Sequence, residues 1–267
     1  MNFNILRQTV FTNSGLIRLS KISLKNFLRK KTGKLIGGGD RVLTVENENI
    51  KYKFEELPDD NFYVLYGADG SDCVMVIIKD KIAEIHGIGN NSTCLTNSNQ
   101  NVGSTLLKIT IKMIKKYANK FNIKIITLVD NSLKKCGGTD IKLALMLTLI
   151  TGHTWYGKHG FRPYDEAKQQ LDPLLNKKYE QNISQMKKIT IGQANILEYI
   201  KKTNKSSLIK AVEQIQKTNP HMLLTDFIAN FLVKFDQTCK YFASFYEELF
   251  YNLGLFSFHK LSFGLVV

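Results

Sequence analysis

The feature that most constrains the fold is a change of hydrophobic period near Gly103. Upstream of it, short runs rich in β-branched residues are separated by Gly and Asp turns, as in 62–66, 73–79 and 82–88. This pattern is typical of an antiparallel meander. Downstream of Gly103 the apolar residues follow helical spacing, and 123–129 is then a continuous apolar run of the kind that forms a strand buried on both faces.

This order of elements predicts an α/β (α+β) fold, in which a mixed, mostly antiparallel sheet is flanked by helices. Beyond Pro163 the strand signal almost vanishes. Further helices are expected over residues 141–151, 195–202, 206–217 and 223–251, with Gly152 as a C-cap. We therefore expect one domain over residues 1–165, followed by a helical C-terminal region over residues 166–267.

The first 39 residues form a basic segment that contains no Asp or Glu. Two interpretations remain open. An acid-poor, Ser-containing start is typical of an organelle transit peptide. Alternatively, a short strand is followed by a basic helix over roughly Gly15–Lys31, which ends at Gly37-Gly38-Gly39. We favour the second, because a Gly-rich turn followed by a strand pattern continues the fold without a small-residue cleavage signal.

The net charge of +14 comes mainly from lysine, since only five of the 37 basic residues are arginines. Dedicated readers of phosphates and bases favour Arg, and a chain rich in Lys, Asn and Ile is typical of an AT-rich genome. We therefore interpret most of this charge as solvated surface, while nonspecific nucleic acid remains a candidate partner. No apolar run is long enough to span a bilayer, so we expect no membrane association and a soluble, cytoplasmic protein.

The four cysteines stand singly and form no C-x-x-C pair. This arrangement favours a reducing compartment and argues against structural zinc. Cys94 and Cys136 have no His partner in view, so inert thiols are expected there. We predict no metal cofactor.

Two segments contain candidate binding and catalytic residues. The first, Gln100-Asn101-Val102-Gly103-Ser104-Thr105, opens a helix directly after a strand and a loop. Unpaired backbone amides and the positive end of the helix dipole make such a turn an anion-binding site, for which a pyrophosphate is a suitable ligand. The second segment runs from Trp155-Tyr156-Gly157 through Gly160-Phe161 to Pro163.

Together these motifs resemble the GCN5-related N-acetyltransferase (GNAT) superfamily of acyl-CoA-dependent amine acyltransferases. Gln100 to Gly103 matches the start of the family's Q/R-x-x-G-x-G/A motif, although Thr105 stands where the family has Gly or Ala. The later family signature of an aromatic residue, Tyr and Gly-Phe is similar to residues 155–161. The segments Leu128–Ser132 and Thr154–Gly157 also look like those of uncharacterised members encoded by giant DNA viruses, for which host cytoplasm or the virion would be the location.

The resemblance implies acetyl-CoA as co-substrate and assigns roles to particular residues. Tyr156 would protonate the departing thiolate. The Ile88 N–H would polarise the thioester carbonyl, at a strand end where the family splays two strands apart. The pyrophosphate would bind the turn that Gln100 opens, on the amides of Asn101, Val102, Gly103, Ser104 and Thr105, with Lys108 one turn further in.

The candidate bases that would take the amine proton lie on the expected strand 82–88. Glu84 and His86 lie two residues apart there, so their side chains share one face of the sheet. In some branches of the family, a Glu or His on this strand takes the amine proton. His159 is expected to be a surface residue that follows Tyr156.

We therefore expect an acyl-CoA-dependent N-acyltransferase that transfers acetyl from acetyl-CoA to a primary amine by direct attack in a ternary complex. The alternative is a catalytically degenerate GNAT-fold protein that binds a protein partner or nucleic acid. Aromatic residues recur along one stripe of the C-terminal helices from Phe227 to Phe258. Such a stripe is more often core than interface, but a homodimer through the C-terminal helices remains an open alternative.

Overall fold

The computed structural model describes residues 9–12, 15–18, 42–57, 61–89, 92–95, 102–136, 139–232 and 242–267. The chain divides into two compact units, residues 1–41 and residues 42–267. In the first unit, β1 (Thr9–Thr12) pairs antiparallel with β2 (Gly15–Arg18). The expected helix over Gly15–Lys31 is therefore wrong for its first four residues, which form a strand, and the rest of it lies outside the described residues.

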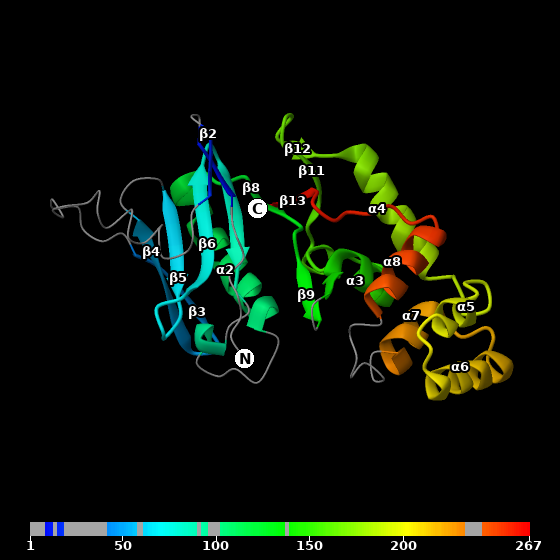
Figure 1. Cartoon of the computed structure of the whole chain (residues 1–267). Coiled ribbons are helices and arrows are strands. Elements are labelled where there is room, and N and C mark those ends of the chain that lie inside the picture. The colour runs from blue at the N-terminus through cyan, green and yellow to red at the C-terminus, as the bar shows by residue number, and fades with distance from the viewer. Residues whose placement is uncertain are drawn as a thin grey trace, which may run out of the picture. The chain divides into compact units, whose positions relative to one another are not determined.

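The second unit begins with the expected antiparallel meander (Figure 1). Each strand pairs with the next one along the chain. Side chains alternate between a face that is buried and a face that is more open, as in β6 and β7. The five strands are β3 (Val42–Asn47), β4 (Ile50–Leu57), β5 (Phe62–Tyr66), β6 (Asp72–Lys79) and β7 (Ile82–Ile88).

Helix α2 (Val102–Phe121) covers the buried face of this meander and contacts β3, β6 and β7. Its buried positions include Leu106, Ile109 and Met113, which recur at helical spacing. The chain then enters β8 (Ile125–Val129), which lies parallel to β7. A strand, a crossover helix and a parallel strand thus place the start of α2 near the end of β7.

After β8 the chain alternates between short strands and helices. The hairpin β9 (Leu133–Cys136) and β10 (Thr139–Lys142) leads into α3 (Leu143–Thr151). Gly152 ends α3 in the left-handed conformation, with φ of 76°, as expected for a C-cap. The remaining elements are η2 (Gly157–His159), β11 (Arg162–Asp165), β12 (Gln170–Leu171), α4 (Pro173–Met186), α5 (Ile196–Lys201), α6 (Ser206–Thr218), α7 (Leu224–Phe227), a π-helical turn (Ile228–Leu232), α8 (Phe242–Asn252) and β13 (Ser262–Val266).

The last strand changes the expected division of the chain. β13 lies inside the sheet, where it pairs antiparallel with both β8 and β11. The resulting strand order is β12-β11-β13-β8-β7-β6-β5-β4-β3. The expected mixed, mostly antiparallel sheet flanked by helices is confirmed. The expected boundary near residue 165 lies inside residues 42–267, which form one compact unit.

Two apolar clusters hold this unit together. The first lies between the sheet and α2, and it includes Tyr156 and Phe161. The second joins α3 to the C-terminal helices. Phe227, Phe242 and Phe245 of the aromatic stripe are buried in the second cluster. These three side chains therefore belong to the core, as such stripes usually do, and are not available to a partner.

Cys73 on β6 and Cys94 in the single turn η1 (Ser92–Cys94) form a disulfide, with an S–S distance of 2.00 Å. The expectation of an inert thiol at Cys94 is therefore wrong. The separation of the two cysteines by 21 residues has no local signature, so only the fold brings them together. Disulfides are typical of oxidising environments, which removes the cysteine argument for a reducing compartment.

Among the described helices, none combines the length and the apolar character needed to cross a membrane.

Candidate functional site

The sheet opens between β7 and β8. Their parallel pairing covers only Ile82–Glu84 against Ile125–Thr127. β7 continues to Ile88 and β8 to Val129, but no further pairing joins the two strands in the described part of the chain. On its other side, β7 stays paired to β6 as far as Ile88. The pairing between β7 and β8 thus ends at Glu84 and Thr127, four residues before the end of β7.

A register shift accompanies this opening. Ile85 pairs with Val76 and Gly87 with Met75, so His86 is the extra residue of a β-bulge. Bulges bend a strand and increase its local twist, and they are frequent beside binding sites. The sequence predicted a bulge or a close ligand approach around the two glycines that flank Ile88, and the bulge lies immediately upstream of that position.

The first turn of α2 lies beyond the end of β7. Val102, Gly103, Ser104 and Thr105 are all partly exposed. The amides of a first helical turn have no acceptor within the helix, and the helix dipole adds positive potential there. Gln100 and Asn101, which were expected to open this turn, lie outside the described residues. Lys108 is exposed one turn further along.

Trp155 joins the two sequence motifs. Its Nε1–H donates to the Ser104 hydroxyl oxygen at 3.2 Å. A Cβ added to Gly103 would lie 3.4 Å from the Trp155 ring, so the indole packs closely along the first turn of α2. The Trp155 and Tyr156 rings lie 4.7 Å apart between centroids. The structure thus brings Gly103–Ser104 and Trp155–Tyr156 together across 51 residues of sequence.

Tyr156 is nearly covered, with 9% of its surface exposed. Burial, and then the nearby charge of Asp130, raise the pKa of its hydroxyl. The phenol is therefore neutral at physiological pH, as a hydrogen-bond donor must be. Among the described residues its hydroxyl has no hydrogen-bond partner. The backbone beyond it is fixed by Gly157 N–H, which donates to Thr154 Oγ1 at 3.1 Å, and by Gly160 at φ of 90°.

Glu84 and His86 share a face of β7, as predicted. A Glu84 carboxylate oxygen lies 3.2 Å from His86 Nε2, and both side chains are about two-fifths exposed. The hydrogen bond from His86 lowers the pKa of Glu84 below its usual value. Ala83 and Ile85 belong to the cluster under α2, so Glu84 and His86 point to the opposite face. The structure does not bring them into contact with Tyr156, which packs on the α2 side.

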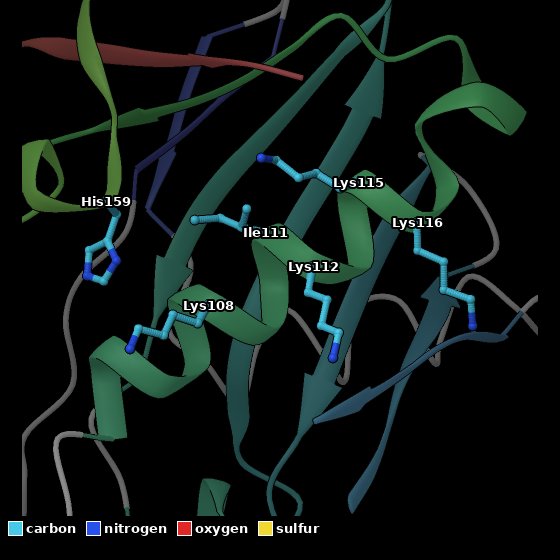
Figure 2. A pocket seen from close by; sticks show the side chains of 6 residues that line it. All are labelled: Lys108, Ile111, Lys112, Lys115, Lys116 and His159. Atoms are coloured by element: carbon cyan, nitrogen blue, oxygen red, sulfur yellow. The ribbon is translucent and has the colours of Figure 1, made fainter. Parts of the chain in front are cut away.

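A hollow of about 620 Å³ lies along the outer face of α2 (Figure 2). One wall comes from α2 and the other from His159, which the chain brings in from η2. The hollow is lined by Lys108, Ile111, Lys112, Lys115, Lys116 and His159. Burial, and then the charges of Lys108 and Lys158, lower the pKa of His159. His159 is therefore a partly buried wall of a positively charged hollow and not merely a surface residue.

A second hollow, of about 530 Å³, adjoins the first one through Lys112 and Lys116. It is also lined by Glu46 near the end of β3 and by Glu48 in the turn between β3 and β4, so its charge is mixed. The first hollow, beside Lys108 and His159, has no acidic residue in its lining, and it also lies nearer the start of α2.

Asp130 is a residue that the sequence analysis did not select. It follows β8 directly and is 0% exposed. One carboxylate oxygen accepts from the Ser132 hydroxyl and from the Ser132 amide. The other has no hydrogen-bond partner in the part of the chain that the structure describes. Burial raises the pKa of Asp130 to about 6, although the Ser132 bonds lower it in part. The sequence feature that could have identified Asp130 is its position as an acidic residue directly after a buried strand.

Among the described residues, no group of three or more His, Cys, Asp and Glu side chains is arranged to hold a metal ion. Comparison of the chain with protein-family models, with curated proteins and with solved structures found no match.

Proposed function

We propose that the chain is an acyl-CoA-dependent N-acyltransferase of GNAT type that transfers acetyl from acetyl-CoA to a primary amine. The observation that carries this proposal is the contact between Trp155 and the first turn of α2. It joins the segment that holds the candidate acid, Tyr156, to the helix that holds the candidate diphosphate site, although the two motifs are far apart in sequence.

The diphosphate would bind at the start of α2. The amides of Val102 to Thr105 would supply the donors, in a turn whose residues are partly exposed. The basic hollow continues from this turn along the helix, and Lys108 lines it. A CoA molecule carries further phosphate beyond its diphosphate, so a positive surface next to the turn suits the rest of the nucleotide.

The acyl arm would enter between β7 and β8. The pairing of these strands ends at Glu84 and Thr127, and an extended amide-containing chain would lie along β7 beyond that point. In this proposal the Ile88 N–H polarises the thioester carbonyl as negative charge develops on its oxygen.

The proton chemistry would use both sides of this opening. Tyr156 donates a proton to the sulfur as the C–S bond breaks. Glu84, hydrogen-bonded to His86, is the carboxylate on the open face that accepts a proton from the nitrogen, directly or through water. The low pKa of Glu84 keeps it ionised at neutral pH, which an acceptor requires.

The test compares Tyr156→Phe with the unaltered chain in acetyl transfer from acetyl-CoA to a panel of amines. Loss of the phenol proton should lower kcat by about 10²-fold or more, with little change in CoA affinity. A fall in CoA affinity with unchanged kcat would contradict the assigned role. Thermal shift with acetyl-CoA and desulfo-CoA measures binding separately, and a ligand at 100 times its Kd adds about 2.7 kcal/mol to stability.

A second candidate function is polyanion binding through the lysine face of α2. The observation that favours it is the basic hollow itself, in which four lysines lie within nine residues of one helix (Figure 2). Binding of this kind falls steeply between 50 and 200 mM salt and does not depend on Tyr156. Salt-sensitive binding of a DNA duplex that survives Tyr156→Phe, without any CoA binding, would favour this function over the transferase.

A further inference from the structure

Helix α4 contacts the segment that carries Tyr156 through the side chain of Tyr179, which is 1% exposed. The Tyr179 hydroxyl lies 3.2 Å from His153 Nδ1. A Cβ added to Gly157 would overlap the same hydroxyl, so the phenol lies directly against the Gly157 backbone. Tyr179 therefore contacts the chain both before and after Trp155 and Tyr156.

Thr154 links these two contacts. It is 0% exposed, and its Oγ1 accepts from the Gly157 N–H at 3.1 Å. The same Oγ1 lies 3.1 Å from the Cβ position of Gly157 that the Tyr179 hydroxyl occupies. Burial raises the pKa of Tyr179, which the charge of Arg162 and hydrogen bonds from Thr154 lower in part. The Tyr179 hydroxyl thus belongs to a small buried polar cluster that fixes the turn at Tyr156.

Arg162 joins the far end of this turn to α4. Its guanidinium lies over the Tyr179 ring, 5.2 Å from the centroid. Its Nε lies 3.6 Å from a carboxylate oxygen of Glu180. Arg162 Nη1 donates to the Phe161 carbonyl at 3.0 Å and to the Gly157 carbonyl at 3.4 Å. Two consecutive residues of α4 therefore face the turn.

The Tyr179 ring is itself held by the core. The ring centroids of Phe258 and Phe263 lie 5.3 and 6.3 Å from its own, both in edge-on geometry. Phe263 belongs to β13, which lies inside the sheet. The hydroxyl is therefore presented by a packed side chain, as a group that positions another residue must be.

We propose that α4 positions the Tyr156 phenol for acyl transfer and that the Tyr179 hydroxyl is the positioning group. This inference rests on the proposed transferase function, and it adds to that function a role for the C-terminal region. Tyr179 acts on the reaction only through the turn that carries Tyr156. A proton donor must be held to within a fraction of an ångström of its productive place, so a turn that shifts slightly loses much of its rate.

The experiment measures kcat, KM and CoA affinity for the unaltered chain, Tyr179→Phe, Tyr156→Phe and the double variant, with acetyl-CoA and the best amine of the panel. Tyr179→Phe removes the hydroxyl and keeps the ring. It should lower kcat by about tenfold, while KM and CoA affinity change by less than about twofold. In the double variant the Tyr179 substitution should cause no further loss, because the phenol that it positions is already absent.

Tyr164→Phe is the matched control. Tyr164 is also buried, at 5% exposed, but its hydroxyl has no hydrogen-bond partner among the described residues. Its loss should leave kcat unchanged. Urea unfolding of every variant measures the effect on the fold separately. If Tyr179 only stabilised the fold, Tyr179→Phe would lower the active fraction by the same factor with or without the Tyr156 phenol.

His153→Phe serves if Tyr179→Phe does not fold. His153 is the partly exposed partner of the same hydroxyl, and its substitution removes one hydrogen bond. It should lower kcat by about threefold, which corresponds to one lost neutral hydrogen bond, and again only in a chain that keeps Tyr156.

The outcomes separate the two proposals. An unchanged kcat in Tyr179→Phe, or an equal loss with and without the Tyr156 phenol, would overturn the positioning role and leave the transferase standing. An unchanged kcat in His153→Phe would do the same if Tyr179→Phe does not fold. Absence of acetyl transfer by the unaltered chain would overturn the transferase, and the positioning role with it.

Discussion

Burial of the Asp130 carboxyl links the stability of the chain to pH, whatever the chemistry of the site. Its pKa lies near 6 in the folded chain, above the ordinary value of 3.8. Between these values the folded chain keeps a proton that the unfolded chain has lost. The free energy of unfolding therefore falls as pH rises from about 4 through 6.

Asp130→Asn should remove this dependence. The displacement from 3.8 to about 6 corresponds to about 3 kcal/mol, because each pKa unit is worth about 1.4 kcal/mol. Between pH 4 and pH 8, the unfolding free energy of the variant should rise by about 2.4 kcal/mol relative to the unaltered chain, because an unfolded Asp is already partly ionised at pH 4. Urea unfolding at several pH values measures the difference. A difference that is constant with pH would show that Asp130 is ionised in the fold as easily as in the unfolded chain.

Gly157 is the residue whose lack of a side chain matters most to the Tyr156 segment. A Cβ there would overlap the Tyr179 hydroxyl. Gly157→Ala should therefore destabilise the chain by about 3 kcal/mol through overpacking. Gly254→Ala is the comparison, since Gly254 has open space around its Cβ position and carries only a positive φ of 68°. That variant should cost about 1 kcal/mol in the same unfolding assay, and equal losses in both would contradict the clash.

At the residue scale, the sequence predicted the shared face of Glu84 and His86 but missed Asp130. Alternation along a strand is a local property, so it can be read from the chain directly. The burial of Asp130 depends on Lys260 and Leu261, which are about 130 residues away. No local pattern reports such a contact.

At the scale of elements, the Cys73–Cys94 disulfide fixes the segment that follows β7. It ties η1 to β6, and Ala68 N–H donates to the Thr93 carbonyl at 2.9 Å beside it. The loop toward α2 therefore begins at an anchored point. Of the site elements, the sequence predicted β7, α2 and β8, because their hydrophobic periods are clear, but it could not predict how Trp155 packs on α2.

Cys73→Ser with Cys94→Ser should lower the unfolding free energy by about 2 to 4 kcal/mol, since the bond closes a loop of about 20 residues in the unfolded chain. The measurement is the thermal midpoint with and without dithiothreitol. Reductant should lower the midpoint of the unaltered chain to that of the double variant and leave the variant itself unmoved. If the thermal midpoint of the unaltered chain does not change with reductant, the two sulfurs are not bonded in solution.

At the scale of the molecule, residues 42–267 form one unit because β13 completes the sheet. This strand pairs with β8 and β11 after a long run of helices. A five-residue strand at the end of a helical region has a weak sequence signal, and its partners are fixed only by the tertiary structure. The sequence therefore predicted the class of the fold but not the place of β13 in the sheet.

One cooperative unit should unfold in one transition. Trp155 is the only tryptophan of the chain and reports on the cluster between the sheet and α2. Far-ultraviolet circular dichroism is dominated by the helices of the second cluster. The two signals should therefore give the same urea midpoint, as a two-state transition requires. Midpoints that differ would instead support a separate C-terminal helical domain.

The most direct test of the central claim is calorimetric titration of CoA into the chain and two variants at one position. Val102→Pro removes one first-turn amide while Pro remains compatible with the start of a helix, and Val102→Ala keeps that amide. We predict one bound CoA per chain, similar affinity for the unaltered chain and Val102→Ala, and about tenfold weaker binding for Val102→Pro, as expected for one lost hydrogen bond to a charged group. No saturable binding, or equal affinity for the two variants, would contradict a diphosphate site at the start of α2.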